Sequence, residues 1–333
     1  MEFKKYSSIE NSYRDKFVNR ITEEGHAKQT FVVQEKIHGS NFSLWASVEG
    51  IRAAKRTGFI KDDEKFFCYD TIIKKYGQSV LNILAVTGAD EVAVFGELYG
   101  GIYPHKDVPN VDQSKVQSGV FYAPGQEFVA FDIKVDGKYL SVEHVNALCE
   151  EAGIPYSETL LTGSLEECLA YSNEFQTTIP AKLGLPEIEG NMCEGVVIRP
   201  IVPLFLFSQE RLILKNKNAK FKEKTGDGGT RKTKAPPEPL SEAATIALMK
   251  ANLFITKNRL RNVLSKIGEV TQKDFGKIMG LFSKDIIEDF LKEEQEFFDT
   301  LEKTDRKKVT KYVGQSAALM VRENFLNIVD GEF

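Results

Sequence analysis

Glu35-Lys36-Ile37-His38-Gly39-Ser40-Asn41 is the segment around which we expect the rest of the chain to be organised. The run 30–33 before it is β-branched and aromatic and predicts a strand, and Gly39 predicts the turn that ends it. Lys36 is therefore expected at a strand end, with its amine facing the space that the turn opens. A lysine amine is a nucleophile only when deprotonated, so burial or neighbouring cations must lower its pKa from about 10.4. A lone lysine at a strand end is more often a solvated side chain, so other clusters must decide between the two interpretations.

Length and composition limit the class of protein. The 333 residues predict two domains, and the hydrophobic share of 42% predicts a soluble protein with a proper core. A net charge of −4 means that any nucleic-acid-binding surface must be local. We expect no signal peptide and no membrane span, because the N-terminal charges precede no apolar run and no run approaches about 18 residues. Four widely spaced cysteines without a Cys-x-x-Cys pair argue against zinc or disulfides and favour a cytoplasmic location, a host cytoplasm if the gene is from a phage.

The first two thirds of the chain read as a strand-rich α+β domain. We expect strands over 30–38, 42–48 and 51–55 as an antiparallel meander, and further strands over 92–98, 127–135, 138–142, 195–201 and 211–216. Helices are expected over 13–24, 61–84, 145–152 and 165–171. The helix over 61–84 would present one apolar face: Ile72, Ile73, Tyr76, Val80, Ile83 and Leu84.

The last third has a different composition. Glycines and prolines between 225 and 240 cannot sustain a helix or a central strand and predict a linker. After Ser241 the pattern is helical to the end, with Ile246, Met249 and Leu253 at helical spacing and a final helix over about 305–326. We expect domains at 1–228 and 241–333, joined by a linker at 229–240.

Three clusters in the first domain suggest a ligand site. Arg56 stands before a glycine turn, where its guanidinium could grip a phosphate or a sugar. Glu97 lies in a glycine-flanked run that would let a ligand approach the backbone, and it could accept a ribose hydroxyl. Phe131 alternates with Ala130 and Asp132 and could stack on a purine. Taken singly, each also fits a bland role: a surface strand end, a solvated turn acid and a core aromatic.

Two later clusters carry opposite charges. Glu194 beside Gly195 begins a strand and could bind a divalent metal. Lys215 and Lys217 are two apart on a strand, so both would face the same side, which is tolerated most easily where an anion lies between them. From 211 to 234, nine residues are Lys or Arg and two are Asp or Glu, a local basic surface that suits a nucleic-acid backbone. The alternatives are a strand-edge acid and a solvated lysine-rich edge.

In order and spacing, these motifs resemble the covalent lysyl-nucleotidyltransferases, the superfamily of DNA ligases, RNA ligases and mRNA capping enzymes. The resemblance covers residues 30–220 and is strongest to the phage RNA ligase 2 (T4 RNA ligase 2-like) family, with the kinetoplastid RNA-editing ligases as relatives. His38 stands where DNA ligases and capping enzymes usually carry Asp, and the chain continues after Lys217 into helices rather than a β-rich OB domain. The resemblance implies an antiparallel-sheet, ATP-grasp-like adenylyltransferase domain followed by a smaller all-α domain.

The resemblance also implies a reaction. Lys36 would attack the α-phosphate of ATP and hold AMP as a phosphoramidate. AMP would then pass to the 5′-phosphate of a nicked RNA, and a neighbouring 3′-hydroxyl would displace it. The expected partner is RNA with 3′-OH and 5′-phosphate ends, in a duplex, and the expected state is a monomer. The implied cofactors are ATP and Mg²⁺ or Mn²⁺.

Roles for the other matching residues are likewise implied by the resemblance. Ile37 would offer backbone groups to the adenine and Phe131 would stack on it, while Arg56 and Glu97 would hold the ribose. His38 would favour pyrophosphate departure, and Glu194 would help to bind the metal. Lys215 and Lys217 would neutralise the α-phosphate. Glu35 would contact the nucleotide, and Asn41 would match the nick-sealing position.

Alternatives are a DNA ligase, a GTP-using capping guanylyltransferase, and a non-catalytic nucleic-acid-binding module that keeps the fold. The last is disfavoured because every charged motif residue is present.

Overall fold

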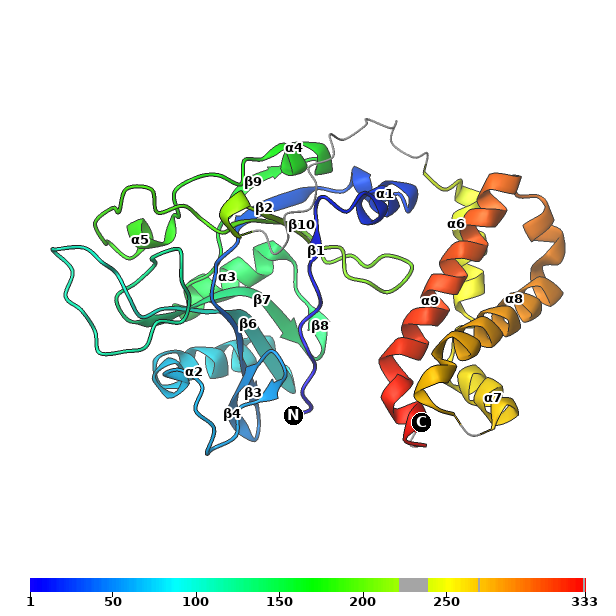
Figure 1. Cartoon of the computed structure of the whole chain (residues 1–333), viewed down its shortest axis with the longest axis horizontal. Coiled ribbons are helices and arrows are strands. Elements are labelled where there is room, and N and C mark those ends of the chain that lie inside the picture. Colours follow the sequence, from blue (N-terminus) through cyan, green and yellow to red (C-terminus); the bar gives the residue numbers. More distant parts are fainter. Residues whose placement is uncertain (222–238, 269, 332) are drawn as a thin grey trace. The chain divides into compact units, whose positions relative to one another are not determined.

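The computed structural model describes residues 1–221, 239–268, 270–331 and 333. The chain forms two compact units, which Figure 1 shows with their elements labelled. The first unit contains Met1–Asp15, Lys28–Leu204 and the stretch that begins at Leu212. The second contains Lys16–Ala27, Phe205–Arg211 and the C-terminal helices. Most of the predicted linker, and residues 222–234 of the predicted basic run, lie outside the described residues.

Two antiparallel-rich sheets make up the first unit. The five-stranded sheet has the order β1-β11-β10-β2-β9, and only its β1–β11 pair is parallel. Its strands are β1 (Glu10–Asn11), β2 (Phe31–Glu35), β9 (Thr159–Gly163), β10 (Gly195–Pro200) and β11 (Leu214–Lys217). The six-stranded sheet has the order β5-β4-β3-β6-β7-β8. Its strands are β3 (Ser40–Ser47), β4 (Gly50–Lys55), β5 (Gly58–Phe59), β6 (Glu91–Gly100), β7 (Gln126–Val135) and β8 (Lys138–Tyr139). The α+β class predicted from sequence is confirmed.

Helices cover the six-stranded sheet. The helix α2 (Tyr69–Thr87) packs on β3, β4 and β6, and α3 (Val142–Ala152) packs on β7. The predicted face of α2 is confirmed, because Ile72, Tyr76, Val80 and Ile83 are buried. The helix begins at Tyr69 rather than at residue 61, since Phe67 has a φ of 48°, which a right-handed helix cannot contain. The first unit also contains α4 (Leu165–Ala170), α5 (Ile179–Lys182) and the 3₁₀ turn η2 (Ala219–Phe221). The 3₁₀ turn η1 (His26–Lys28) begins in the second unit and ends in the first.

The strand β2 does not form a meander with β3 and β4, so that prediction is wrong. It pairs with β10 and β9 in one sheet, while β3 pairs with β4 and β6 in the other. Residues 36–39 therefore cross from one sheet to the other. Gly39 makes this crossing possible, because a Cβ there would lie 2.1 Å from the carbonyl oxygen of Leu98.

The second unit is helical. Its elements are most of α1 (Asp15–Glu23), α6 (Glu242–Asn252), α7 (Lys257–Ile267), the 3₁₀ turn η3 (Gln272–Asp274), α8 (Phe275–Asp299) and α9 (Lys303–Val329). Leu248, Phe282, Phe290 and Val313 lie in its buried core. Ser241 caps α6, because its hydroxyl accepts a hydrogen bond from the backbone N–H of Ala244 at 3.1 Å.

The apolar residues whose spacing predicted the helix α6 do not form its buried face. Ile246, Met249 and Leu253 are 42%, 61% and 77% exposed. The buried face instead consists of smaller side chains with Leu248: Ala244, Ala247, Leu248 and Ala251. The small alanine side chains let α6 approach its neighbours closely. A sequence pattern of large apolar residues does not reveal this kind of packing.

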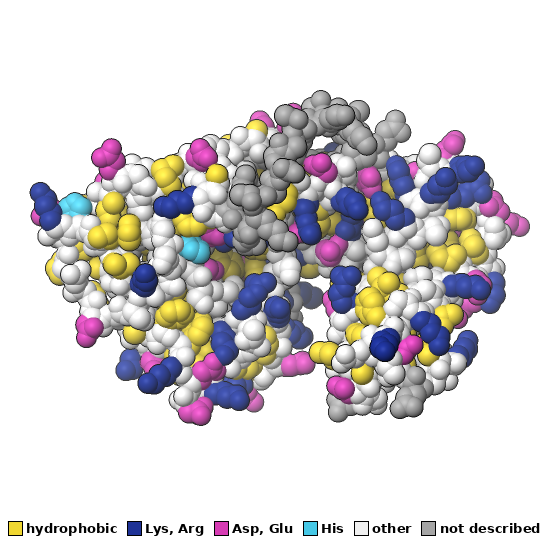
Figure 2. All heavy atoms as spheres, viewed as in Figure 1, with side chains coloured by type: hydrophobic (Ala, Val, Ile, Leu, Met, Phe, Trp, Pro, Cys, Tyr) yellow, Lys and Arg dark blue, Asp and Glu magenta, His cyan; other side chains and the backbone are white. Residues whose placement is uncertain are grey.

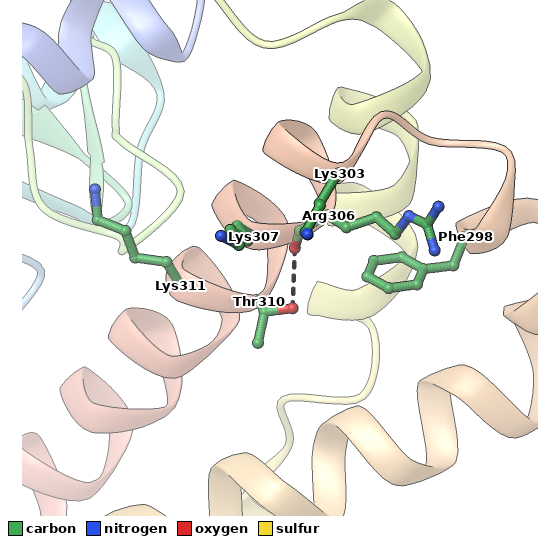
Figure 3. A pocket seen from close by; sticks show the side chains of 6 residues that line it. All are labelled: Phe298, Lys303, Arg306, Lys307, Thr310 and Lys311. Atoms are coloured by element: carbon green, nitrogen blue, oxygen red, sulfur yellow. Dashed lines mark hydrogen bonds between the residues drawn. The ribbon is translucent and has the colours of Figure 1, made fainter.

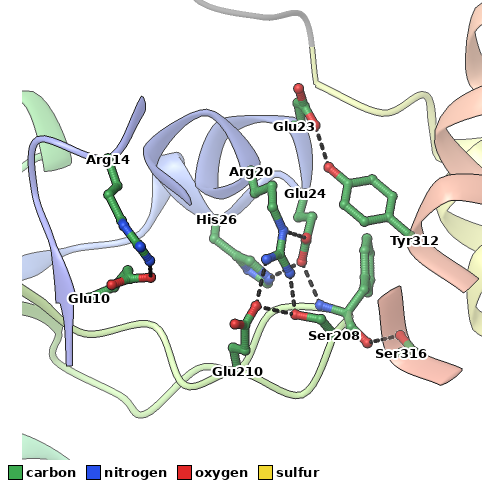
Figure 4. A network of polar contacts seen from close by, with 11 residues as sticks. Glu10, Arg14, Arg20, Glu23, Glu24, His26, Ser208, Glu210, Tyr312 and Ser316 are labelled. Atoms are coloured by element: carbon green, nitrogen blue, oxygen red, sulfur yellow. Dashed lines mark hydrogen bonds and ion pairs between the residues drawn. The ribbon is translucent and has the colours of Figure 1, made fainter. Parts of the chain in front are cut away.

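A polar network fixes α1 to the loop 205–211 and to α9 within the second unit (Figure 4). The buried Glu24 carboxylate accepts a hydrogen bond from the Phe207 backbone N–H at 2.6 Å and is paired with Arg20 at 3.4 Å. Arg20 also pairs with Glu210 at 2.6 Å. On α9, the Tyr312 hydroxyl donates to Glu23, and Ser316 donates to the Phe207 carbonyl at 2.7 Å.

Over the residues described, no helix is both long and apolar enough to cross a membrane.

Candidate active site

A cavity of about 430 Å³ opens between the two sheets of the first unit. It is lined from β2 and the crossing segment, from β3, β6 and β7, and from β10 and β11. Nine of the eleven predicted site residues line it: Glu35, Lys36, Ile37, Asn41, Arg56, Glu97, Phe131, Lys215 and Lys217. His38 and Glu194 do not line it, but both lie behind Lys36 and contact the same cluster of charges.

The Lys36 amine is paired with a carboxylate. Its Nζ lies 2.7 Å from Glu194 Oε2, and the lysine side chain is 18% exposed. The backbone fixes this geometry, because Lys36 N–H donates to the Gly195 carbonyl at 2.9 Å, next to Glu194. The sequence predicted cations around Lys36, whereas the partner that the structure places at its amine is an anion, Glu194.

Glu194 is the centre of this charge cluster. It is 2% exposed, and its Oε1 lies 3.2 Å from Lys217 Nζ. His38 Nδ1 lies 3.6 Å from Glu194 Oε2, and burial lowers the pKa of His38. Gly195 places the cluster, since its φ is +145° and a Cβ there would lie 2.1 Å from the Asn216 carbonyl on β11. A buried carboxylate shared by two lysines is stable here because both of its oxygens have cationic partners.

The opposite wall carries Glu97, Asn41 and Arg56. Glu97 on β6 is half-buried and pairs in register with Asn41 on β3. Desolvation raises the pKa of Glu97 to about 7, against the opposing effect of the Lys36 charge. Arg56 lies on the exposed turn between β4 and β5 and interacts with Glu97 through its charge.

Phe131 reaches the cavity because β7 contains a bulge. Phe95 pairs with Asp132 and Gly96 pairs with Ala130, so Phe131 has no partner on β6. A bulge re-aims the extra side chain. Gly96 makes room for the distortion, because a Cβ there would lie 2.2 Å from the Val129 carbonyl.

Behind Phe131 is a buried support that the sequence reasoning missed. Arg199 pairs with Asp132 at 3.0 Å and donates to the Phe131 carbonyl at 2.8 Å. The Tyr6 hydroxyl donates to Asp132 at 2.8 Å, and its ring lies 5.1 Å from that of Phe131. Arg199 and Tyr6 both line the cavity. An arginine within the apolar run 195–201 was an available signal for Arg199, but no local pattern connects Tyr6 with a strand 126 residues later.

Glu35 and Ile37 are held from outside the cavity. The Glu35 carboxylate accepts hydrogen bonds from Thr177 Oγ1 at 2.5 Å and from Thr178 Oγ1 at 2.7 Å, and burial raises its pKa. Ile37 is 6% exposed and packs with Tyr122. The neighbouring His38 N–H donates to the Tyr122 hydroxyl at 2.9 Å. These contacts fix the backbone on both sides of Lys36.

The acidic side chains near Lys36 are the candidate ligands for a divalent metal. Within the described ranges, no group of three or more His, Cys, Asp or Glu side chains is gathered as a ready-made metal site. Glu194 pairs with Lys36, and Glu97 interacts with Lys36 through its charge. Mg²⁺ commonly uses one or two carboxylates together with substrate phosphates, so this donor set fits a metal that arrives with a nucleotide.

Comparisons with known proteins show the family of the chain. A family profile described as RNA ligase matches residues 29–217, and one described as T4 RNA ligase 2 C-terminal matches residues 239–318. The chain belongs to the RNA ligase family and is an RNA ligase by class.

Its similarity to particular relatives is extensive. It is 29% identical to the mitochondrial RNA-editing ligase 2 of Trypanosoma brucei brucei, over 93% of this chain and 88% of that protein. It is 31% identical to the mitochondrial RNA-editing ligase 1 of the same organism, over 83% and 73%. Among solved structures, Naegleria gruberi RNA ligase with PPi has a TM-score of 0.45 and 15% identity, covering 66% of this chain and 57% of that one.

Proposed function

We propose that the cavity binds ATP and that Lys36 is the nucleophile that takes AMP from it before RNA ends are joined. The carrying observation is that one lysine amine lies in a cavity whose walls supply an aromatic ring, a carboxylate and two further lysines: Phe131, Glu97, Lys215 and Lys217. A solved structure of Naegleria gruberi RNA ligase contains ATP and Mn.

In the first step, the Lys36 nitrogen attacks the α-phosphorus of ATP. A P–N bond forms, the bond from that phosphorus to the bridging oxygen breaks, pyrophosphate leaves, and the amine loses a proton. Lys36 must leave its ion pair with Glu194 before it can attack, because a protonated amine has no free electron pair. Lys215 and Lys217 would neutralise charge on the phosphates, and charge neutralisation and positioning account for most of phosphoryl-transfer catalysis.

Glu194 and Glu97 would hold the Mg²⁺ or Mn²⁺ that accompanies the nucleotide. When bound, such a metal supplies charge neutralisation at the triphosphate. Phe131 would stack on the adenine, and Arg56 and Glu97 would contact the ribose. Because Glu194 is also the partner of Lys36, its carboxylate would be shared between the lysine amine and a bound metal.

The test uses ATP labelled at the α-phosphate, with magnesium and the full chain, followed by a denaturing gel. We expect a labelled protein band that Lys36→Ala abolishes and that Lys74→Ala, an exposed lysine on α2, retains. No labelled band, or an equal band from Lys36→Ala, would overturn the proposal. Labelling by GTP in place of ATP would indicate capping chemistry instead.

We further infer that the ends joined are a 3′-hydroxyl and a 5′-phosphate at a nick in duplex RNA, and that the enzyme works as a monomer. The support is family membership together with the clustered lysines that face the cavity. A panel of RNA and DNA nicks and single strands with these ends tests it. Preferential sealing of the RNA nick is expected, whereas equal sealing of single strands would refute the duplex assignment.

A further inference from the structure

The beginning of α9 carries a concentration of positive charge that the nucleotide cavity does not use. Between residues 303 and 311 there are five cations and a single acid, Asp305. The cations are Lys303, Arg306, Lys307, Lys308 and Lys311. Figure 2 shows Lys and Arg side chains gathered at the end of the second unit where α9 begins.

These side chains line an open hollow of about 600 Å³. Its lining consists of Phe298, Lys303, Arg306, Lys307, Thr310 and Lys311 (Figure 3). Lys303, Lys307 and Lys311 are four residues apart and exposed, so they form one row along the helix with steps of about 6 Å. We call this row, with Arg306 and Thr310, the α9 basic face.

No acid of the described part of the second unit compensates the charges of the row. Among the residues that the structure describes, Lys303, Lys307 and Lys311 have no acidic partner. Arg306 is held by Asp299 at 3.0 Å and by the Leu301 carbonyl at 2.9 Å.

The single acid of this stretch does not offset the row. Asp305 is 7% exposed, and it accepts a hydrogen bond from the Ser241 hydroxyl at 2.6 Å. Two other exposed lysines of this unit do have acidic partners, since Lys284 pairs with Glu288 at 3.6 Å and Lys292 pairs with Asp289 at 2.7 Å.

The opposite side of the helix fixes the row in place. Val309, Tyr312 and Val313 are fully buried in the core of the unit, so α9 cannot rotate to spread its lysines. Like charges four residues apart cost about 0.2–0.5 kcal/mol per pair in a helix. A polyanion bound along the row would be attracted by all three lysines and would offset their mutual repulsion.

We propose that the α9 basic face binds the sugar–phosphate backbone of RNA, an inference that rests on the proposed function. Lysines are point charges without fixed geometry, so they suit phosphates in any sequence rather than base edges. The Thr310 hydroxyl adds a donor within the row, although it donates to the Arg306 carbonyl at 3.0 Å in this structure. The face would thus hold RNA without reading its sequence and would leave the nucleotide chemistry to the first unit.

The test replaces the row by glutamine in the full chain: Lys303→Gln, Lys307→Gln and Lys311→Gln together. Glutamine forms helices about as well as lysine, so α9 should persist, and circular dichroism checks this. The matched control is Lys257→Gln, Lys284→Gln and Lys292→Gln, which removes the same charge from exposed lysines elsewhere in the unit. The probe is a labelled RNA duplex with one 3′-OH/5′-phosphate nick, and its affinity is measured across a series of salt concentrations.

For the row variant we expect affinity to fall by about tenfold or more at low salt. The slope of log affinity against log salt should become shallower by about 2–3, because each lost phosphate contact contributes close to one. The control variant should keep both values. Equal affinity and slope in the row variant, or equal losses in both variants, would overturn the proposal.

The proposed function can fail independently of this inference. Transfer of label from ATP to Lys36 is measured without RNA, and the row variant should label like the wild type. Absence of labelling in the wild type would refute the nucleotide assignment, while the salt slopes would still report on the α9 basic face.

Discussion

At the residue scale, the notable feature is that Lys36 and Lys217 share one buried carboxylate, Glu194. A single acid that pairs with both lysines holds their two amines close to each other. Both amines then need the same event, loss of Glu194 as partner, in order to act. The ion pairs therefore position the two amines and do not themselves supply reactivity.

Phe131 offers a direct test of the purine platform. Replacing it by alanine should raise the KM for ATP in lysyl-AMP formation by about tenfold or more, since a base–aromatic stack contributes about 1–3 kcal/mol. Phe131→Leu should lose less, because it keeps part of the apolar surface.

The control for Phe131 is Tyr13→Ala, which removes an aromatic ring that is 67% exposed. An unchanged KM in Phe131→Ala would show that the ring supports the fold and does not touch the base.

Glu97 and Lys215 are predicted to be indispensable for the overall reaction. Glu97→Ala removes the carboxylate opposite Lys36, and Lys215→Ala removes a cation that lines the cavity, so each should abolish sealing of a nicked RNA. The measurement is product formation on a denaturing gel over a fixed time. Near-normal joining by either variant would mean that its role is misassigned.

At the element scale, the sequence predicted the strands better than their pairing. The runs that became β2, β3 and β4 were recognised because β-branched and aromatic residues cluster between glycines. Periodicity does not say which strands pair, and β2 joined β10, more than 150 residues later, instead of β3. The bulge at Phe131 is similarly invisible, because it depends on the partner strand and on the missing side chain of Gly96.

The helix α6 shows a second limit. Ile246, Met249 and Leu253 have the spacing of a buried face, but the alanines on the other side of the helix are the ones that pack. Close packing rewards fit rather than size, and fit depends on neighbours that a single helix sequence does not contain. The gathering of the candidate site residues was easier to predict, since Glu97 and Glu194 stand beside Gly96 and Gly195, where the backbones of neighbouring strands approach closely.

Glu24 gives the α1 network a measurable pH dependence. Desolvation raises its pKa from 4.5 to about 7, against the opposing effects of the Phe207 N–H and Arg20. The folded state therefore keeps a proton that the unfolded state loses between about pH 4.5 and 7. Its stabilising contribution is present below pH 4.5 and is lost as the pH rises to about 7.

This effect is isolated by the difference in melting temperature between the wild type and Glu24→Gln. Both melting temperatures are measured by far-UV circular dichroism. The difference should fall as the pH rises from about 4.5 to 7 and then level off. Glu143→Gln, at an exposed site on α3, controls for the substitution itself. A difference that grows with pH would show that Arg20 keeps Glu24 ionised.

At the scale of the whole molecule, chemistry and architecture divide along the two units. Every residue that lines the proposed nucleotide cavity belongs to the first unit. The second unit is not merely the C-terminal third, because α1 and the loop 205–211 belong to it through Glu23, Phe207 and their partners on α9. The family profile matches divide the chain by sequence at about residue 239, whereas packing assigns two earlier segments to the helical unit.

Deleting residues 241–333 should separate the steps of the reaction. Formation of the labelled lysyl-AMP species should be largely kept, because the cavity and all of its lining remain. Sealing of a nicked RNA should fall by about tenfold or more, since the lysines of the α9 basic face and their phosphate contacts are removed. The deletion also strips Glu23 and Phe207 of Tyr312 and Ser316, so the truncated protein should melt at a lower temperature than the full chain. Measuring adenylylation and sealing side by side, below that temperature, distinguishes loss of RNA contacts from loss of fold. Equal loss of both steps would refute the division of labour.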